Sequence, residues 1–274
     1  MSISERPKID CHCHIFDPAR FPYDPASPYH PAGQEIATAA QMRHVFAAHR
    51  VEHALLVQPN SGYGYDNSCM LDAIANSGGR WKGVAVAPDN ASLGHLSELK
   101  DQGIVGIAIN LPFYAAGYYN SHAALFDRIA QLDMWLQVQV EDTMLLDILP
   151  MLQDSGAKLL IDHCGRPNID KGLGQPAFET LLDLGRGDRA AIKLSGYVKF
   201  SQVPHPFEDT RPFAQALIDA FGVENCIWGS DWPFLRAPSR VDYGPLLDLF
   251  ADLVPEVGHQ NAILWDNPKR LFGF

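Results

Sequence analysis

The sequence predicts a (β/α)8 TIM barrel of the α/β class, formed by a single domain over residues 1–274. Three observations lead to this prediction. Eight short apolar or β-branched runs recur along the chain, a segment with helical periodicity follows them in turn, and polar residues gather where the runs end. No low-complexity tract, charge block or Ser/Gly linker divides the chain, so we expect one domain.

The predicted strands are mostly continuous apolar runs, as expected of parallel strands that are buried on both faces. In chain order they cover residues 8–16 (KIDCHCHIF), 53–59 (HALLVQP), 83–88 (GVAVAP), 103–111 (GIVGIAINL), 135–141 (WLQVQVE), 157–165 (AKLLIDHCG), 190–196 (AAIKLSG) and 225–233 (NCIWGSDWP).

The predicted helices lie between these runs, and two more follow the last one. They cover residues 38–49, 66–78, 92–103, 122–133, 143–156, 177–186, 210–222, 243–254 and 267–274. A doubly wound open sheet is the competing arrangement, but neither Gly-x-Gly-x-x-Gly nor a P-loop follows the first run. The barrel is therefore the preferred interpretation.

Composition argues against several classes of partner. The formal net charge is −11, from 21 Lys and Arg against 32 Asp and Glu, so we expect binding neither to nucleic acid nor to a membrane. The N-terminus lacks a secretory apolar region, and we expect a cytoplasmic protein, with homo-oligomerisation left open. Its five cysteines form no Cys-x-x-Cys pair, which favours reduced thiols. We expect Cys11 and Cys13 to pack outward against helices.

The polar residues of the runs carry the functional signal. His12 and His14 stand two apart, so an extended backbone places them on one face. Other runs end in Gln58, Asn110, Gln139, Glu141, Asp162, His163, Ser195 and Asp231. In a barrel, the C-terminal ends of the strands form the face that bears active sites.

His12, His14, His163 and Asp231 offer nitrogen and oxygen ligands without a thiolate, which suits a catalytic divalent ion with an open coordination position. We expect one zinc or manganese ion, with a metal-free site as the alternative. Strand alternation points one member of the Asp162–His163 pair inward. We expect that member to be His163, with Asp162 as a supporting acid.

These residues resemble the signature of the amidohydrolase superfamily, amidohydrolase 2 type: His-x-His after strand 1, a middle-strand His and a strand-8 Asp, here DCHCH, IDHCGRP and WGSDWP. The chain is more closely similar to the branch of 2-pyrone-4,6-dicarboxylate lactonase and related sugar-lactone and muconolactone hydrolases. FPYDP, YHP, YDN, KLSG and DNPKRLF extend this resemblance over nearly the whole chain. It implies a hydrolase that opens a carboxylated lactone in aromatic or sugar-acid catabolism, and it places Tyr29 of YHP in the substrate site.

The chain also departs from the family pattern. Members with two metals carry a carbamylated lysine on strand 4, whereas GIAINL has none, so we expect at most one ion. The dicarboxylate lactonase grips its substrate with arginines near strand 4, and Ala108 and Tyr114 occupy those places here. Arg166 and Lys199 remain. We therefore expect monocarboxylated lactones to be better substrates than the pyrone dicarboxylate.

Lactone hydrolysis needs a base for the attacking water and a group that stabilises the oxyanion. Asp231 is the expected base, with Glu141 next, and the three histidines are expected to polarise the carbonyl directly or through an ion. The expected substrate contacts are Arg166, Lys199, Tyr29, Gln58, Gln139, Ser195 and Tyr114. Tyr118, Tyr119 and Trp232 are candidates for packing or substrate contact, and His205 is expected on the surface.

Three rival functions remain open at this point. The first is a metal-dependent non-oxidative decarboxylase of the same superfamily, and the second is a lactone isomerase. The third is a barrel that binds a ligand without catalysis. The chain length and HCGRP favour the lactonase, and four ionisable groups at one barrel mouth argue for catalysis.

Overall fold

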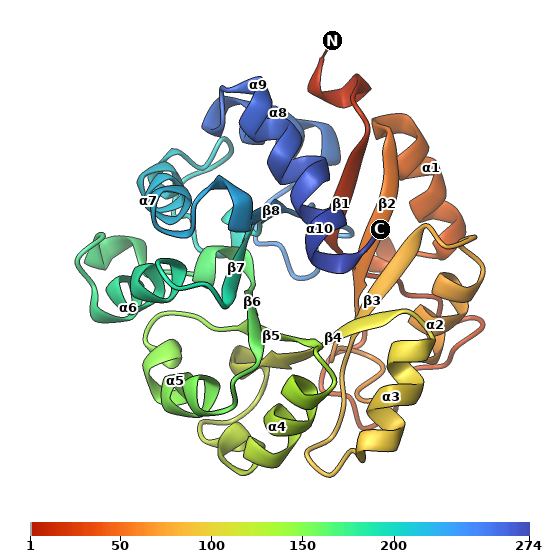
Figure 1. The fold of residues 1–274 in the computed structure, drawn as a ribbon. Coiled ribbons are helices and arrows are strands. Elements are labelled where there is room, and N and C mark those ends of the chain that lie inside the picture. The colour runs from red at the N-terminus through yellow and green to blue at the C-terminus, as the bar shows by residue number, and fades with distance from the viewer. Residues whose placement is uncertain (1) are drawn as a thin grey trace.

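The computed structural model describes residues 2–274, and its strands form an eight-stranded parallel sheet in the order β1 to β8 (Figure 1). The strands are β1 (Lys8–Cys13), β2 (Val51–Val57), β3 (Trp81–Ala85), β4 (Ile104–Asn110), β5 (Trp135–Gln139), β6 (Lys158–Ile161), β7 (Ala190–Leu194) and β8 (Cys226–Trp228). Each overlaps one predicted run. The barrel prediction is therefore confirmed.

The sheet closes where the first strand meets the segment that follows the last one. Cys13 forms a parallel bridge with Trp232, and the His14 N–H donates to the Trp232 carbonyl at 2.8 Å. The Asp231 N–H donates to the His12 carbonyl at 2.8 Å. This seam brings the loop after β8 directly against the end of β1.

The helices surround the sheet on its outer face (Figure 1). They are α1 (Ala39–His49), α2 (Ser68–Ala75), α3 (Leu93–Asp101), α4 (Ala123–Gln131), α5 (Met144–Asp154), α6 (Pro176–Gly185), α7 (Arg211–Phe221), α8 (Tyr243–Leu253), α9 (Val257–Asn261) and α10 (Asn267–Phe272). The α9 segment and the π-helical turn Ala262–Asp266 were not predicted. In the short stretch between the two last predicted helices, most apolar residues fall in the single run AILW at 262–265, which is too short to show a helical period.

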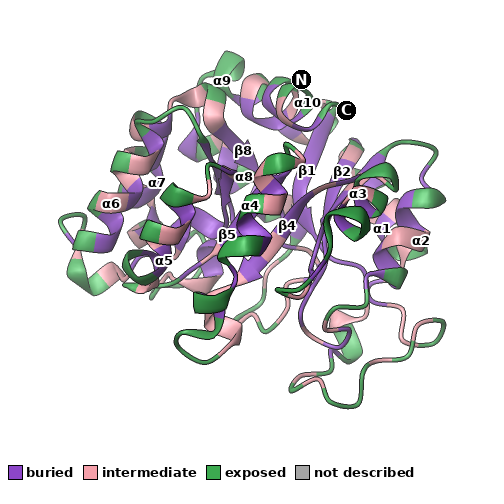
Figure 2. Ribbon diagram, turned by 60° about the horizontal axis from the view of Figure 1, so that its bottom comes forward, coloured by how far each residue is buried: buried purple, intermediate pink, exposed green. Residues whose placement is uncertain are grey.

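Two apolar cores flank the strands, which are largely buried (Figure 2). The larger core lies between sheet and helices. The smaller one joins inward-facing residues of strands around the barrel, including Ile9, Leu55 and Ile227, to Phe272 of α10. Lys82, near the start of β3, donates to the Phe272 carbonyl at 2.7 Å. The α10 helix therefore seals the end of the barrel at which the strands begin.

A register shift in β1 changes which side chains point inward. Asp10 pairs with Ala54 and Cys13 with Leu56, so β1 holds one residue more than β2 over this stretch. Cys13 packs in the outer core as expected, but Cys11 packs inside the barrel, so its predicted outward position is wrong. The extra residue lets Cys11 and His12 both face inward, which strict alternation cannot do.

Within residues 2–274, no helix is long and apolar enough to cross a membrane. All five cysteines are buried and free.

Candidate active site

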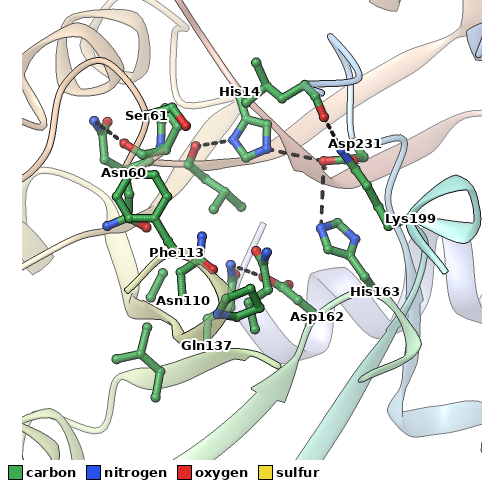
Figure 3. Close-up of a pocket in the computed structure, with 18 of the residues that line it drawn as sticks. His14, Asn60, Ser61, Asn110, Phe113, Gln137, Asp162, His163, Lys199 and Asp231 are labelled. Carbon is green, nitrogen blue, oxygen red and sulfur yellow. Dashed lines mark hydrogen bonds and ion pairs between the residues drawn. The ribbon is translucent and has the colours of Figure 1, made fainter. Parts of the chain in front are cut away.

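A cavity of about 360 Å³ lies at the C-terminal ends of the strands. Its lining comes from the ends of β1, β2, β4, β5 and β6 and from the loops that follow β7 and β8. Its deepest part is polar, because His14, His163, Asp162 and Asp231 all contribute to the wall (Figure 3). The site therefore lies on the face that the strand ends predicted.

Three imidazoles converge on one oxygen of Asp231. The distance from Asp231 Oδ1 to Nε2 is 3.7 Å for His12, 3.4 Å for His14 and 3.8 Å for His163. All four side chains are at least nine-tenths buried. The four residues that the sequence proposed as one set are thus brought together.

The backbone around this cluster is unusual, and glycines make room for it. Asp231 and His163 both have left-handed backbone conformations, with φ of 62° and 50°. A Cβ at Gly196 would lie 2.5 Å from His163 Nδ1, and one at Gly229 would lie 2.5 Å from His12 Cβ. Only glycine at these positions lets the two rings enter the site.

A hydrogen bond on the far side of the His14 ring fixes which of its nitrogens carries the proton. His14 Nδ1 lies 2.8 Å from the Val57 carbonyl, which can only accept, so His14 must donate from Nδ1. In its neutral form His14 therefore presents an Nε2 lone pair toward the Asp231 carboxylate. His12 Nδ1 lies 3.2 Å both from Asp162 Oδ1, an acceptor, and from Lys193 Nζ, a donor, which allows either tautomer. His163 Nδ1 contacts the Ser195 hydroxyl at 3.0 Å, which allows either tautomer.

Burial keeps the imidazoles of His12 and His163 neutral. It lowers the pKa of His12 to about 4, with the nearby Lys193 acting in the same direction. It also lowers the pKa of His163 well below its ordinary value. Burial would raise the pKa of Asp231, but Lys199, whose Nζ lies 3.6 Å from Oδ2, and the histidines outweigh it and hold that pKa well below its usual range. The site thus combines an ionised carboxylate with the neutral imidazoles of His12 and His163.

A second polar group lies below this cluster, and the sequence reasoning missed most of it. Lys193 of β7 is fully buried, and its Nζ lies 2.6 Å from Gln137 Oε1 and 3.0 Å from Asp162 Oδ1. Gln137 Nε2 donates to the other Asp162 oxygen at 2.7 Å. A lysine inside an otherwise apolar run was the signal that could have identified this network.

Asp162 occupies a different position from the one expected. It lines the cavity and pairs with His12 and Lys193, so both Asp162 and His163 face inward. Strand alternation fails here because β6 ends at Ile161, before this pair, and the chain turns at once into a 3-10 helix (His163–Gly165). Burial opposes ionisation of Asp162, but Lys193 and His12 outweigh it and lower its pKa.

His12, His14 and Asp231 form a candidate group for a divalent ion, because their ligand atoms lie within 4.8 Å of one another. The distances from Asp231 Oδ1 to the three histidine nitrogens, 3.4–3.8 Å, suit ligands at about 2.0–2.2 Å from a shared ion, and His163 lies at the edge of this group. Asp231 Oδ2 is buried and finds no hydrogen-bond partner in the described part of the chain. His12, Asp162 and His163 form an overlapping candidate group, but Asp162 already accepts from Lys193 and Gln137. Asp231 is therefore the better carboxylate ligand.

Four of the predicted substrate contacts line the cavity: Gln58, Gln139, Arg166 and Lys199. Arg166 is largely buried, its Nη1 lies 3.8 Å from Glu141, and its Nε lacks a partner within residues 2–274. Lys199 forms an ion pair with Asp231 and donates to the Leu235 carbonyl. Its charge is therefore partly neutralised by the Asp231 carboxylate before any substrate binds.

The other three predicted contacts lie outside the lining. Ser195 is buried behind His163, which it contacts. Tyr29 donates to Glu35, and the Tyr114 hydroxyl accepts from Asn60 Nδ2 at 3.1 Å. Each of the three is held by a neighbour beside the cavity, and its contact with substrate stays a prediction.

The aromatic loop after β4 packs mainly against itself. The rings of Tyr114 and Tyr118 stack with centroids 3.9 Å apart, and the Tyr119 hydroxyl accepts from the Asn110 N–H at 2.8 Å. None of the three tyrosines lines the cavity, nor does Trp232. His205 is exposed and contacts the Pro245 carbonyl at 3.3 Å, away from the site.

Residues 9–274 match the family described as amidohydrolase. The chain is 33% identical to a 4-sulfomuconolactone hydrolase of Hydrogenophaga intermedia, over 96% of this chain and 88% of that one. It is 27% identical to a 2-pyrone-4,6-dicarboxylate hydrolase of Comamonas testosteroni, over 96% and 89%. A crystal structure described as a probable 2-pyrone-4,6-dicarboxylic acid hydrolase of Acinetobacter baumannii, with citric acid bound, superposes with a TM-score of 0.87 at 29% identity, covering 98% of this chain and all of that one.

Proposed function

This chain belongs to the amidohydrolase family, and we propose that it is a hydrolase that opens a lactone bearing an acidic group. One observation carries the proposal. Three imidazole nitrogens surround an ionised carboxylate in a cavity that also holds a buried arginine whose Nε has no hydrogen-bond partner within residues 2–274. The first group suits activation of water and of a carbonyl, and the second suits recognition of an acid.

In the proposed reaction, a water molecule attacks the carbonyl carbon of the lactone. Asp231 accepts a proton from this water at Oδ2, the carboxylate oxygen that has no hydrogen-bond partner among the described residues. The new C–O bond forms, the ring ester bond breaks, and the ring oxygen leaves with the proton that Asp231 returns. The product is a hydroxy acid or its keto tautomer.

We also propose that His12, His14, His163 and Asp231 hold one divalent ion, zinc or manganese. The Nε2 lone pair of neutral His14 faces the Asp231 carboxylate at 3.4 Å and repels it unless a cation lies between them, and this is the support for an ion. When bound, the ion supplies Lewis acidity toward the carbonyl oxygen. Elemental analysis of protein purified without chelators should return one equivalent per chain. Two equivalents, or full activity after exhaustive chelation, would refute this part.

Arg166 is proposed to hold the acidic group of the substrate. Burial lowers the pKa of its guanidinium, Asp231 and Glu141 oppose that shift, and its Nε has no partner in the described chain. A carboxylate in bidentate contact would satisfy these donors and orient the ring. Arg166→Ala should lower kcat/KM for acidic lactones by tenfold or more relative to uncharged ones.

The function is tested with a spectrophotometric panel of acidic and uncharged lactones, with products identified by NMR. We expect ring-opened acids from the wild type and preference for acidic lactones. Release of carbon dioxide from an acid substrate would instead indicate a decarboxylase, and a shifted lactone ring an isomerase. Tight binding without turnover across the panel would favour the binding barrel.

A further inference from the structure

The walls of the cavity differ in charge. Its cations are Arg166, Lys199 and Arg236, which lie on the loops after β6, β7 and β8. The lining from β2, β4 and their loops is uncharged in the described structure. In a closed barrel of this strand order, β2–β4 lie across from β6–β8. Figure 3 shows Asn60, Ser61 and Asn110 on one side and Lys199 and Asp231 on the other.

Asn110 is the unsatisfied residue of the uncharged wall. Its Oδ1 is shielded from solvent and has no hydrogen-bond partner within residues 2–274. The amide nitrogens of its neighbours have acceptors, since Gln58 Nε2 donates to the Asp66 carbonyl at 2.9 Å and Asn60 Nδ2 donates to the Tyr114 hydroxyl at 3.1 Å. Among the carboxamides of this wall, only the Asn110 oxygen is both shielded from solvent and without a partner within residues 2–274. A buried acceptor without a partner is costly, so this oxygen calls for a donor from the ligand.

The position of Asn110 is well defined by its surroundings. It is the last residue of β4, where its backbone pairs with Gln139 of β5, and its N–H donates to the Tyr119 hydroxyl at 2.8 Å. The stacked tyrosines of the loop hold that hydroxyl in place. The carboxamide is thus presented to the cavity from an anchored backbone, which is what selective recognition requires.

The chemistry of this wall disfavours a second anion. A carboxylate placed against it would lose its hydration without meeting a cation, which is costly. A neutral hydroxyl group would lose less and could donate to Asn110 Oδ1. The two walls therefore fit a ligand with its acid on one side and a neutral hydrogen-bonding group on the other.

We propose that Asn110 is a specificity-determining residue that recognises a hydroxyl group on the lactone. The preferred substrate then carries one acidic group against Arg166 and one hydroxyl group against Asn110. This inference rests on the proposed lactone hydrolysis, and it names the substrate class within it.

The test compares three lactones that share one carboxylate and differ at a second position, which holds hydroxyl, hydrogen or carboxylate. For the wild type we expect kcat/KM to fall in that order, with tenfold or more between hydroxyl and hydrogen. Asn110→Leu should bring the hydroxyl-to-hydrogen ratio close to one. Asn110→Arg should reverse the order of hydrogen and carboxylate. Asn120→Leu, the same change on an exposed loop, should leave all ratios as in the wild type.

The outcomes distinguish failure of the proposed role of Asn110 from failure of the proposed lactone hydrolysis. If the wild type opens none of the three lactones, the proposed function fails. If it opens them with no preference for hydroxyl, or if Asn110→Leu keeps the wild-type ratio, the role of Asn110 is refuted while lactone hydrolysis stands. A wild-type preference for the dicarboxylate would also overturn it, and would place the second acid on Arg236.

Discussion

Two layers of buried polar residues lie one above the other at the barrel mouth, and they differ in how fully they are satisfied. The lower layer, Gln137, Asp162 and Lys193, closes on itself through hydrogen bonds of 2.6–3.0 Å. The upper layer, made of His14, His163, Asp231 and Arg166, leaves Asp231 Oδ2 and Arg166 Nε without hydrogen-bond partners in the described structure, although Lys199 Nζ lies 3.6 Å from that oxygen. His12 joins them, because Nδ1 contacts the lower layer and Nε2 faces the upper one.

The difference shows what each layer is for. A buried charge with a complete set of partners stabilises one arrangement and has nothing left to offer a ligand. A buried charged group that lacks some of its hydrogen-bond partners is costly in the free protein, and it becomes useful when a substrate or an ion binds to it. We therefore expect changes in the lower layer to affect stability first and changes in the upper layer to affect turnover first.

The largest effect on turnover is expected from Asp231→Asn. The change keeps the shape of the side chain but removes the base, so kcat should fall by about two to four decades. The melting temperature should stay close to that of the wild type, which a thermal scan measures beside the kinetics. Near-normal activity in the folded variant would move the base to Glu141, which also lines the cavity.

The lower layer is tested by Lys193→Met. This change leaves the Asp162 carboxylate buried without its cation, and we expect a loss of about 3–5 kcal/mol in the free energy of unfolding. Urea denaturation measures it. In the double variant with Asp162→Asn, part of the loss should be recovered, because the unpaired charge is gone. Equal stability of wild type and Lys193→Met would contradict the structural role of this layer.

The pH dependence of stability tests the residues where the layers meet. Burial lowers the pKa of His12 from 6.5 to about 4, so between these values the unfolded chain binds more protons than the folded one. This contribution is fully present above pH 6.5 and is lost as the pH falls toward 4, at a cost on the order of 3 kcal/mol. Urea titrations of metal-free protein over this range measure it. A His12→Asn variant should show a shallower slope, and an equal slope would place the titrating group elsewhere.

The smallest effect is expected from Tyr114→Phe, outside both layers. The ring can still stack on Tyr118, and only the hydrogen bond from Asn60 is lost. Because Tyr114 does not line the cavity, kcat/KM should change by less than about threefold, the equivalent of under 1 kcal/mol. A tenfold loss of kcat/KM for acidic lactones, with an unchanged KM for uncharged ones, would support Tyr114 as a substrate contact.

The strands and the upper layer could be predicted because both follow from local rules. Parallel buried strands read as apolar runs, and strand ends collect functional groups on one face. His12, His14, His163 and Asp231 were found in this way. The lower layer was missed because Lys193 and Gln137 lie within runs, where side-chain direction depends on the register of neighbouring strands.

The remaining differences arise where local periodicity stops. The inward position of Cys11 depends on one extra residue in β1 relative to β2, which no single-strand pattern reveals. Asp162 lies just past the end of β6, where alternation no longer applies. Tyr29 and Tyr114 sit on loops whose partners, Glu35 and Asn60, are set by tertiary packing.

The seam between β1 and the loop after β8 has a consequence for how the molecule acquires activity. Ser230 donates to Asp10 across this seam, and the two residues are 220 positions apart in sequence. Contacts between residues so far apart in sequence are slow to form, because the entropy of closing a long loop is lost before the contacts stabilise the chain. His12 and Asp231 meet at the same seam, so chains refolding from denaturant should regain helical circular dichroism before they regain catalysis. Intermediates in which this seam has not yet formed would then be structured but inactive. Their β1 and β8 edges would be exposed and could pair with strands of other chains.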